Sequence, residues 1–108
     1  MIGRAALLAF AIGALLAGSV AAEPTDEQGE RLERAGALLE DRAGWDEAIA
    51  LYRALLAESP EWTEPRLGLA RVLAWRGDYG ESLEHYERVA ASPSAPPDLA
   101  VERAEVLS

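Results

Sequence analysis

The sequence predicts an all-α protein, an α-solenoid of antiparallel helix pairs with about two and a half repeats. Two stretches carry this prediction, GWDEAIALYRALLAESP at residues 44–60 and DYGESLEHYERVAASPS at residues 78–94, 34 positions apart. In both, apolar or small residues recur at offsets 0, 3, 4, 7, 10 and 11, which lie on one face of an α-helix. No long polar–apolar alternation indicates a strand, and helix pairs at a fixed period are typical of a solenoid.

The first helix is expected to begin at a capping box, in which Thr25 and Gln28 satisfy each other's backbone N–H groups. Gly44 then separates it from the second helix, which the Ser59-Pro60 pair ends. Thr63 can cap the third helix, and Asp78 with Glu81 forms a plausible cap pair for the fourth. The expected helices cover about residues 25–42, 45–59, 63–77, 78–91 and 97–108.

The N-terminal 22 residues have the composition of a secretory signal peptide. Arg4 supplies a positive charge, residues 5–16 are apolar, and small residues precede a cleavage site after Ala22. An uncleaved anchor helix is the alternative, but this segment is rich in the weakly hydrophobic Ala and Gly and barely reaches the ~20 apolar residues of a span. We therefore expect an exported, periplasmic protein; with no cysteine, it needs no disulfide and offers no lipoprotein-type attachment site.

The remaining chain, residues 23–108, is strongly acidic and long enough for one small domain. Removing residues 1–22 takes away Arg4 and no acid, which leaves 9 of the 10 Arg against 19 acidic residues and a formal charge of −10. This charge disfavours nucleic acid and anionic lipid as partners, since both are bound through Lys and Arg. A membrane association is therefore expected only through a partner or through a region downstream of residue 108.

The helix-packing positions of the two copies hold small, apolar and aromatic residues: Leu32, Ala35, Gly36, Leu39, Ala48, Tyr52 and Pro60, then Leu69, Ala70, Leu73, Ser82 and Tyr86. In these positions the chain resembles the tetratricopeptide repeats. The resemblance implies repeats at about residues 29–62 and 63–96 and a half repeat at 97–108. Arg66 departs from the family pattern, which has an aromatic residue near the start of the first helix. The resemblance also implies that small residues let paired helices approach closely and that two Tyr fill the space between repeats.

A narrower similarity concerns LARVLAWRGDY, residues 69–79. This string is similar to repeats in the periplasmic parts of bacterial exopolysaccharide-secretion proteins, often upstream of an outer-membrane barrel. The chain could therefore be the N-terminal periplasmic part of such a protein, with exopolysaccharide machinery as its partner. A sequence of alternating strands after residue 108 would establish this alternative.

The last expected helix repeats the pattern of residues 70–73 in its Ala104, Val106 and Leu107. It would then be the first helix of a third repeat. Its apolar residues spread over more of the helix surface than a one-sided stripe requires. Two interpretations remain. In the first, the helix belongs to a longer solenoid or docks on another chain, with possible self-association through this helix. In the second, it is a self-sufficient cap.

Catalytic chemistry has little support in the sequence. His85 is the one histidine and cysteine is absent, so neither a thiol nucleophile nor a zinc-type cluster is expected. Carboxylate pairs such as Glu40-Asp41 are more often solvated charges on helix surfaces. We expect a non-catalytic protein that uses no metal and no cofactor.

A binding surface is therefore expected to carry the function. The resemblance implies a concave groove lined by the first helix of each repeat, for a protein or peptide partner. Trp75 and Arg71 would place an aromatic plane beside a guanidinium, which suits a peptide carboxylate or a sugar face, so a saccharide-binding accessory module is a further alternative. Trp75 could equally pack against a following helix, and Trp62 is ambiguous in the same way. Carried over by position, the groove residues are Arg34, Ala37, Glu40, Asp41, Leu67, Arg71, Ala74 and Trp75, followed by Val101 and Glu105.

Overall fold

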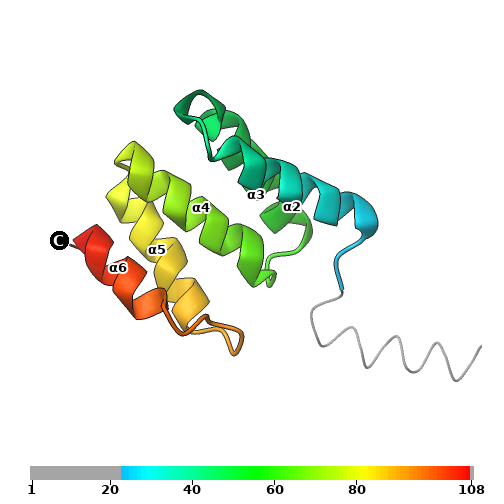
Figure 1. The fold of residues 1–108 in the computed structure, drawn as a ribbon. Coiled ribbons are helices and arrows are strands. Elements are labelled where there is room, and N and C mark those ends of the chain that lie inside the picture. The colour runs from blue at the N-terminus through cyan, green and yellow to red at the C-terminus, as the bar shows by residue number, and fades with distance from the viewer. Residues whose placement is uncertain (1–22, 108) are drawn as a thin grey trace, which may run out of the picture.

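The computed structural model describes residues 23–107, and this part of the chain is helical without a strand (Figure 1). The predicted signal peptide lies outside the described residues. The all-α prediction is confirmed, and helix boundaries after residue 44 agree with it to within two residues. The helices are α2 (Asp26–Leu38), α3 (Trp45–Glu58), α4 (Thr63–Arg76), α5 (Tyr79–Ala90) and α6 (Leu99–Leu107), with a short 3₁₀ helix η1 (Arg42–Gly44) before α3.

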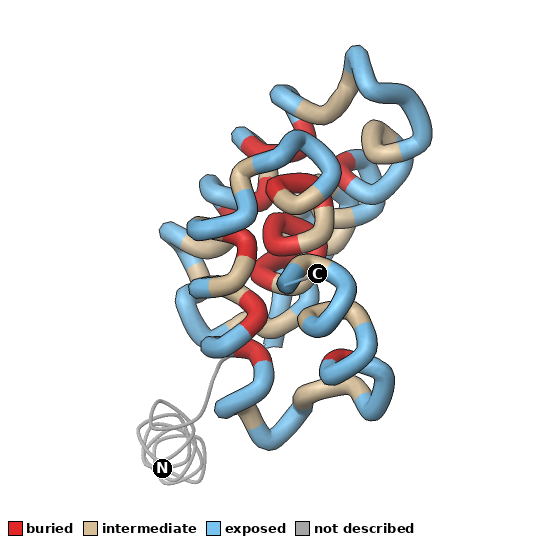
Figure 2. Tube along the Cα trace, turned by 90° about the vertical axis from the view of Figure 1, so that its left-hand side faces the viewer, coloured by how far each residue is buried: buried red, intermediate tan, exposed pale blue. Residues whose placement is uncertain are grey.

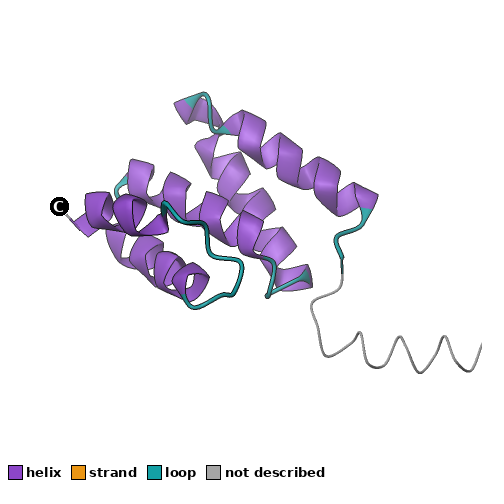
Figure 3. Cartoon of the chain, turned by 60° about the horizontal axis from the view of Figure 1, so that its bottom comes forward, coloured by secondary structure: helices purple, strands orange, loops and turns teal. Residues whose placement is uncertain are grey.

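The helices pack mainly on their neighbours in chain order, so that each hairpin stacks on the next (Figure 1). Short connections join each helix from α2 to α5 to the next one along the chain. A longer loop of residues 91–98, with three prolines, leads from α5 to α6 (Figure 3). Buried residues form a continuous band through the middle of the stack, and the outer faces are exposed (Figure 2). This arrangement is that of a solenoid, in which each unit buries its apolar face against its neighbour.

The first helix is shorter than the sequence predicts. The capping box is present, with Gln28 N donating to Thr25 Oγ1 at 3.1 Å and Thr25 N donating to Gln28 Oε1 at 3.0 Å. The helix ends at Leu38, however, and not near residue 42, because the Asp41 side chain accepts from Ala43 N and starts η1. Gly44 is required in this turn, since a Cβ there would lie 2.6 Å from the Leu38 carbonyl oxygen.

Two predicted helix caps are wrong because other partners hold those side chains. Thr63 is the first residue of α4 and not its cap, and its hydroxyl bonds those of Ser92 and Ser94 at 3.2 and 2.9 Å. Asp78 does precede α5, but its carboxylate makes no cap bond and accepts from Arg76 Nε at 2.6 Å. Contacts within the fold have thus displaced the local pattern.

The core confirms the packing role of the two repeat tyrosines. Tyr52 lies in a cluster formed by α2, α3 and α4, and Tyr86 lies in a second cluster formed by α4, α5 and α6. Of the small residues, Ala48, Ala70 and Ser82 are fully buried, and Ser82 Oγ donates to the Ala70 carbonyl at 2.7 Å. A hydroxyl at this position therefore joins α5 to α4 without leaving a buried polar atom unpaired.

The glycine that permits close packing is not the predicted one. Gly36 is exposed, and a Cβ there would meet no atom within 4 Å, because α2 faces α3 with Ala35 instead. Gly68 on α4 is buried, and a Cβ there would lie 2.7 Å from Cε1 and from Oη of Tyr52, with Cζ closer still. The Tyr52 ring thus lies directly against the backbone of α4.

Candidate functional site

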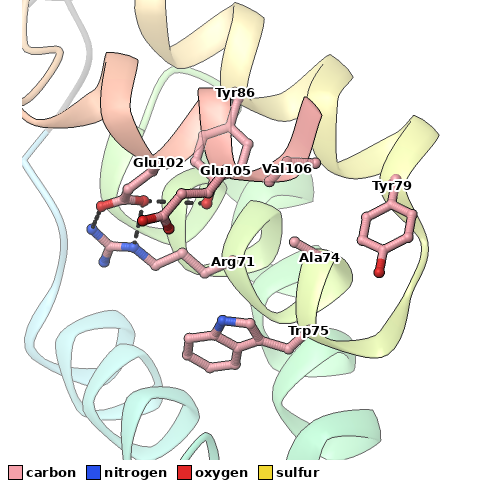
Figure 4. A pocket seen from close by; sticks show the side chains of 8 residues that line it. All are labelled: Arg71, Ala74, Trp75, Tyr79, Tyr86, Glu102, Glu105 and Val106. Carbon is pink, nitrogen blue, oxygen red and sulfur yellow. Dashed lines mark hydrogen bonds and ion pairs between the residues drawn. The ribbon is translucent and has the colours of Figure 1, made fainter. Parts of the chain in front are cut away.

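A cavity of about 390 Å³ opens between α4, α5 and α6 (Figure 4). Two large aromatic residues on its rim are exposed to solvent, Trp75 at 50 % and Tyr79 at 56 %. They come from different helices, Trp75 from the last turn of α4 and Tyr79 from the first residue of α5. The lining residues are Arg71, Ala74, Trp75, Tyr79, Tyr86, Glu102, Glu105 and Val106.

An ion pair joins α4 to α6 at one side of the cavity. Arg71 donates from Nε to Glu102 Oε2 at 2.9 Å and from Nη2 to Glu102 Oε1 at 2.6 Å (Figure 4). Tyr86 on α5 also donates its hydroxyl to Glu102 Oε2 at 3.2 Å. One carboxylate therefore connects three helices, and a bidentate pair of this kind fixes the orientation of both side chains.

The protonation states of these three groups follow from the contacts. The hydrogen bond from Arg71 is the main cause that lowers the pKa of Glu102, and the same bond raises the pKa of Arg71. Burial, followed by the charge of Glu102, raises the pKa of Tyr86 to about 12. At neutral pH the site therefore holds a carboxylate, a guanidinium and a neutral phenol.

Trp75 packs on another tryptophan and not on the Arg71 guanidinium. Its ring centroid lies 5.9 Å from that of Trp45, with the planes tilted by 39°. The guanidinium carbon of Arg42 lies 5.4 Å from the Trp45 ring centroid, and Trp45 Nε1 donates to the Leu39 carbonyl at 3.1 Å. One side of Trp75 is thus supported by the protein while half of its surface faces outward.

The comparison with protein families identifies the family to which this helical arrangement belongs. A family model described as tetratricopeptide repeat matches residues 45–100, from the start of α3 to the start of α6. The chain belongs to the tetratricopeptide repeat family. Neither the search of curated proteins nor the search of solved structures found a match.

The structure brings together only part of the groove that the resemblance implied. Arg71, Ala74 and Trp75 line the cavity, and Glu105 joins them from α6. Val101 is exposed on the same helix but is not among the lining residues. Part of the predicted groove therefore coincides with one wall of the cavity.

The predicted residues of the first repeat lie elsewhere. Arg34 forms an ion pair with Glu47 at 2.6 Å, and Asp41 caps η1. Ala37 and Glu40 are exposed, and neither lines the cavity. Leu67 of the second repeat does not line the cavity either, and is half-buried against the second core cluster.

Sequence reasoning missed four lining residues. Tyr79 had a usable signal, since it stands 34 positions after Trp45 and both open the second helix of a repeat. Tyr86 was predicted to be a packing residue. It does pack in the second core cluster, but its hydroxyl also reaches the cavity. Glu102 and Val106 gave no local signal, because only the docking of α6 places them beside α4.

Arg66, the departure from the tetratricopeptide repeat pattern, belongs to a separate polar network. Its side chain is 8 % exposed and donates to the Pro60 carbonyl at 3.0 Å. It also lies 3.0 Å from His85 Nδ1, and His85 Nε2 lies 3.3 Å from Glu81 Oε2. Because Arg66 can only donate, Nδ1 accepts and the ring hydrogen lies on Nε2, toward Glu81.

Burial is the main cause that lowers the pKa of His85, and the nearby Arg66 charge adds to it while Glu81 opposes it. The neutral imidazole is therefore the form that the fold accommodates. His85 thus links α4 to α5 as a partly buried packing residue, as expected.

Two features are absent from the part of the chain that the structure describes. Residues 23–107 contain no group of three or more His, Cys, Asp or Glu that could hold a metal ion. No helix within the same range is long and apolar enough to cross a membrane.

Proposed function

We propose that this chain is an exported, non-catalytic tetratricopeptide-repeat scaffold that binds a protein partner in the bacterial periplasm. The observation that carries the proposal is the cavity between α4 and α6, with two exposed aromatic side chains above a fixed ion pair. Exposed Trp and Tyr on a rigid support are typical anchors of protein interfaces, because they bury much area with little loss of side-chain freedom.

Export is supported by the N-terminal sequence, with its positive charge, apolar segment and small residues before Glu23. Expression of the full chain in a Gram-negative host, followed by mass spectrometry of the periplasmic fraction, tests this part. The expected product begins at Glu23. A cytoplasmic product that keeps residues 1–22 would contradict export.

Partner binding at the cavity can be tested by site-specific photo-crosslinking in the native cell. p-Benzoylphenylalanine in place of Tyr79 is expected to give discrete protein adducts, because this rim position is exposed and aromatic. The same group at Glu87, exposed on α5 and outside the cavity lining, is the matched control. Equal adducts at both positions, or none at position 79, would count against the cavity as the docking site.

The saccharide-binding alternative is favoured by one observation, the half-exposed indole of Trp75. Sugars stack on such rings, and the similarity of residues 69–79 to repeats of exopolysaccharide-secretion proteins makes an acidic or neutral oligosaccharide a reasonable probe. Saturable quenching of fluorescence that disappears in Trp75→Phe would support it. Quenching that persists in this variant would exclude Trp75 as the sugar platform.

A further inference from the structure

The chemistry of the cavity indicates what kind of segment it receives, and this step rests on the proposed function. A carboxylate ligand is poorly matched, because both Arg71 donors that face Glu102 are already used at 2.6 and 2.9 Å. An incoming carboxylate would have to displace Glu102, which Tyr86 also holds. The expected pairing of Arg71 with a peptide carboxylate is therefore opposed by the geometry.

The charge that remains is negative. Arg71, Glu102 and Glu105 together give the cavity lining a formal charge of −1. The rest of the surface has the same sign, since residues 23–108 carry a formal charge of −10. Many of the guanidinium groups are also engaged within the chain: Arg31, Arg34, Arg53, Arg71 and Arg76 each form an ion pair with one of its carboxylates. A cation approaching the cavity therefore meets a complementary field.

The aromatic rim adds a second attraction for a cation. Trp75 and Tyr79 present ring surface at the cavity, and a guanidinium or ammonium group is attracted to the face of such a ring. The chain already contains one such contact next to the cavity, where Arg42 lies over Trp45 and Trp45 packs on Trp75. The apolar stem of an Arg or Lys can at the same time cover Ala74 and Val106.

We propose that the cavity between α4, α5 and α6 binds an arginine or lysine side chain, so that the docking segment of the protein partner is cationic. The charged head group lies between the Trp75 and Tyr79 rings, on the side of Glu105. The Arg71–Glu102 pair acts as a fixed wall that keeps the cavity open and turns away acidic segments.

Nuclear magnetic resonance titration of ¹⁵N-labelled residues 23–108 tests this inference with three blocked peptides of equal length. Their central residue is Arg, its neutral isostere citrulline, or Glu. The Arg peptide is expected to shift the amide signals of α4 and α6 around the cavity and to bind about fivefold more tightly than the citrulline peptide. Binding should weaken as the NaCl concentration rises, and the Glu peptide should not bind.

Matched variants locate the site. Tyr79→Ala and Trp75→Phe should each weaken binding of the Arg peptide, and Glu105→Gln should weaken it while Glu84→Gln, on the exposed surface of α5, should not. Trp62→Ala is an important control, because Trp62 lines an acidic surface with Glu30 and Glu33 at the other end of the chain. Loss of binding in Trp62→Ala with no effect of Tyr79→Ala would overturn the proposal.

The outcomes separate this inference from the proposed function. Equal binding of all three peptides at the cavity would leave a peptide-binding scaffold and would exclude cation recognition. No binding of the Arg peptide would also exclude it, while crosslinking at position 79 would decide independently whether a protein docks there.

Discussion

Gly68→Ala is the substitution that most directly tests the packing between the two repeats. A Cβ at this position would lie 2.7 Å from Cε1 and from Oη of Tyr52. Non-bonded carbon atoms normally stay about 3.5–4.0 Å apart, so the overlap with Cε1 is about 1 Å. The ring cannot turn aside easily, because Tyr52 is 3 % exposed and packed within the first core cluster.

Two opposing effects determine the sign of the change. Alanine is favoured over glycine within a helix by about 1 kcal/mol. Forcing an extra methyl group into a packed core costs about 1–3 kcal/mol, and the overlap with a buried ring places this site in the upper part of that range. We therefore expect a net loss of about 1–2 kcal/mol in the free energy of unfolding. For a domain of this size, each kcal/mol lowers the melting temperature by about 4–8 °C.

Gly36→Ala is the matched control, because Gly36 lies in α2 and a Cβ there would meet no atom within 4 Å. This variant should gain up to about 1 kcal/mol. A double-mutant cycle with Tyr52→Leu, which removes the overlapping ring atoms, should abolish the cost of Gly68→Ala. Urea unfolding followed by circular dichroism measures the four proteins of the cycle and Gly36→Ala. Stabilisation by Gly68→Ala equal to that of Gly36→Ala would refute the reasoning.

Three further predictions follow from burial, titration and exposure. Tyr52→Ala should cost about 3–5 kcal/mol of unfolding free energy, and an unchanged melting temperature would remove this ring from the core. Because the folded pKa of His85 is lowered, the unfolded chain binds a proton below about pH 6.5 that the folded chain does not take up. Stability should therefore fall from pH 7.5 to 5.5, and less so in His85→Gln; an equal response would contradict the linkage. On α6, Val101 and Leu107 are 62 % and 67 % exposed, so sedimentation should show self-association as concentration rises, weakened by Val101→Ser with Leu107→Ser. A monomer at all concentrations would favour the cap interpretation.

Helical periodicity predicted the core well, because it depends only on neighbours one or two turns away. The offsets of the second helix placed Ala48, Ile49, Tyr52 and Leu55 on one face, and all four are buried. The same rule identified Val89 in the next repeat. Periodicity could not predict which glycine packs closely against a neighbouring helix, because that depends on how α3 crosses α4.

The two wrong cap predictions and the missed partner of Arg71 have the same cause: partners that are distant in sequence cannot be read from a local pattern. Thr63 fits a local capping rule, but serines about 30 residues away compete successfully for its hydroxyl. Arg71 was among the predicted groove residues, but its partner Glu102 lies 31 residues further along the chain and becomes a neighbour only when α6 docks. Side chains whose partners are distant in sequence therefore gave the wrong chemistry, a free guanidinium in place of a closed ion pair.

The repeat period also explains why the cavity lies where it does. Tyr52 packs against Gly68, and one period of 34 residues later the same two positions hold Tyr86 and Glu102. In the first interface the glycine lets the Tyr52 ring lie on the backbone of α4. In the second interface Glu102 stands at that position, accepts a hydrogen bond from the Tyr86 hydroxyl and pairs with Arg71. These polar contacts add to the apolar packing of Leu99 in holding α6, and the cavity lies beside them. A single position in the repeat, glycine in one copy and glutamate in the next, thus distinguishes an interface in which the tyrosine ring lies on the neighbouring backbone from one that borders the cavity.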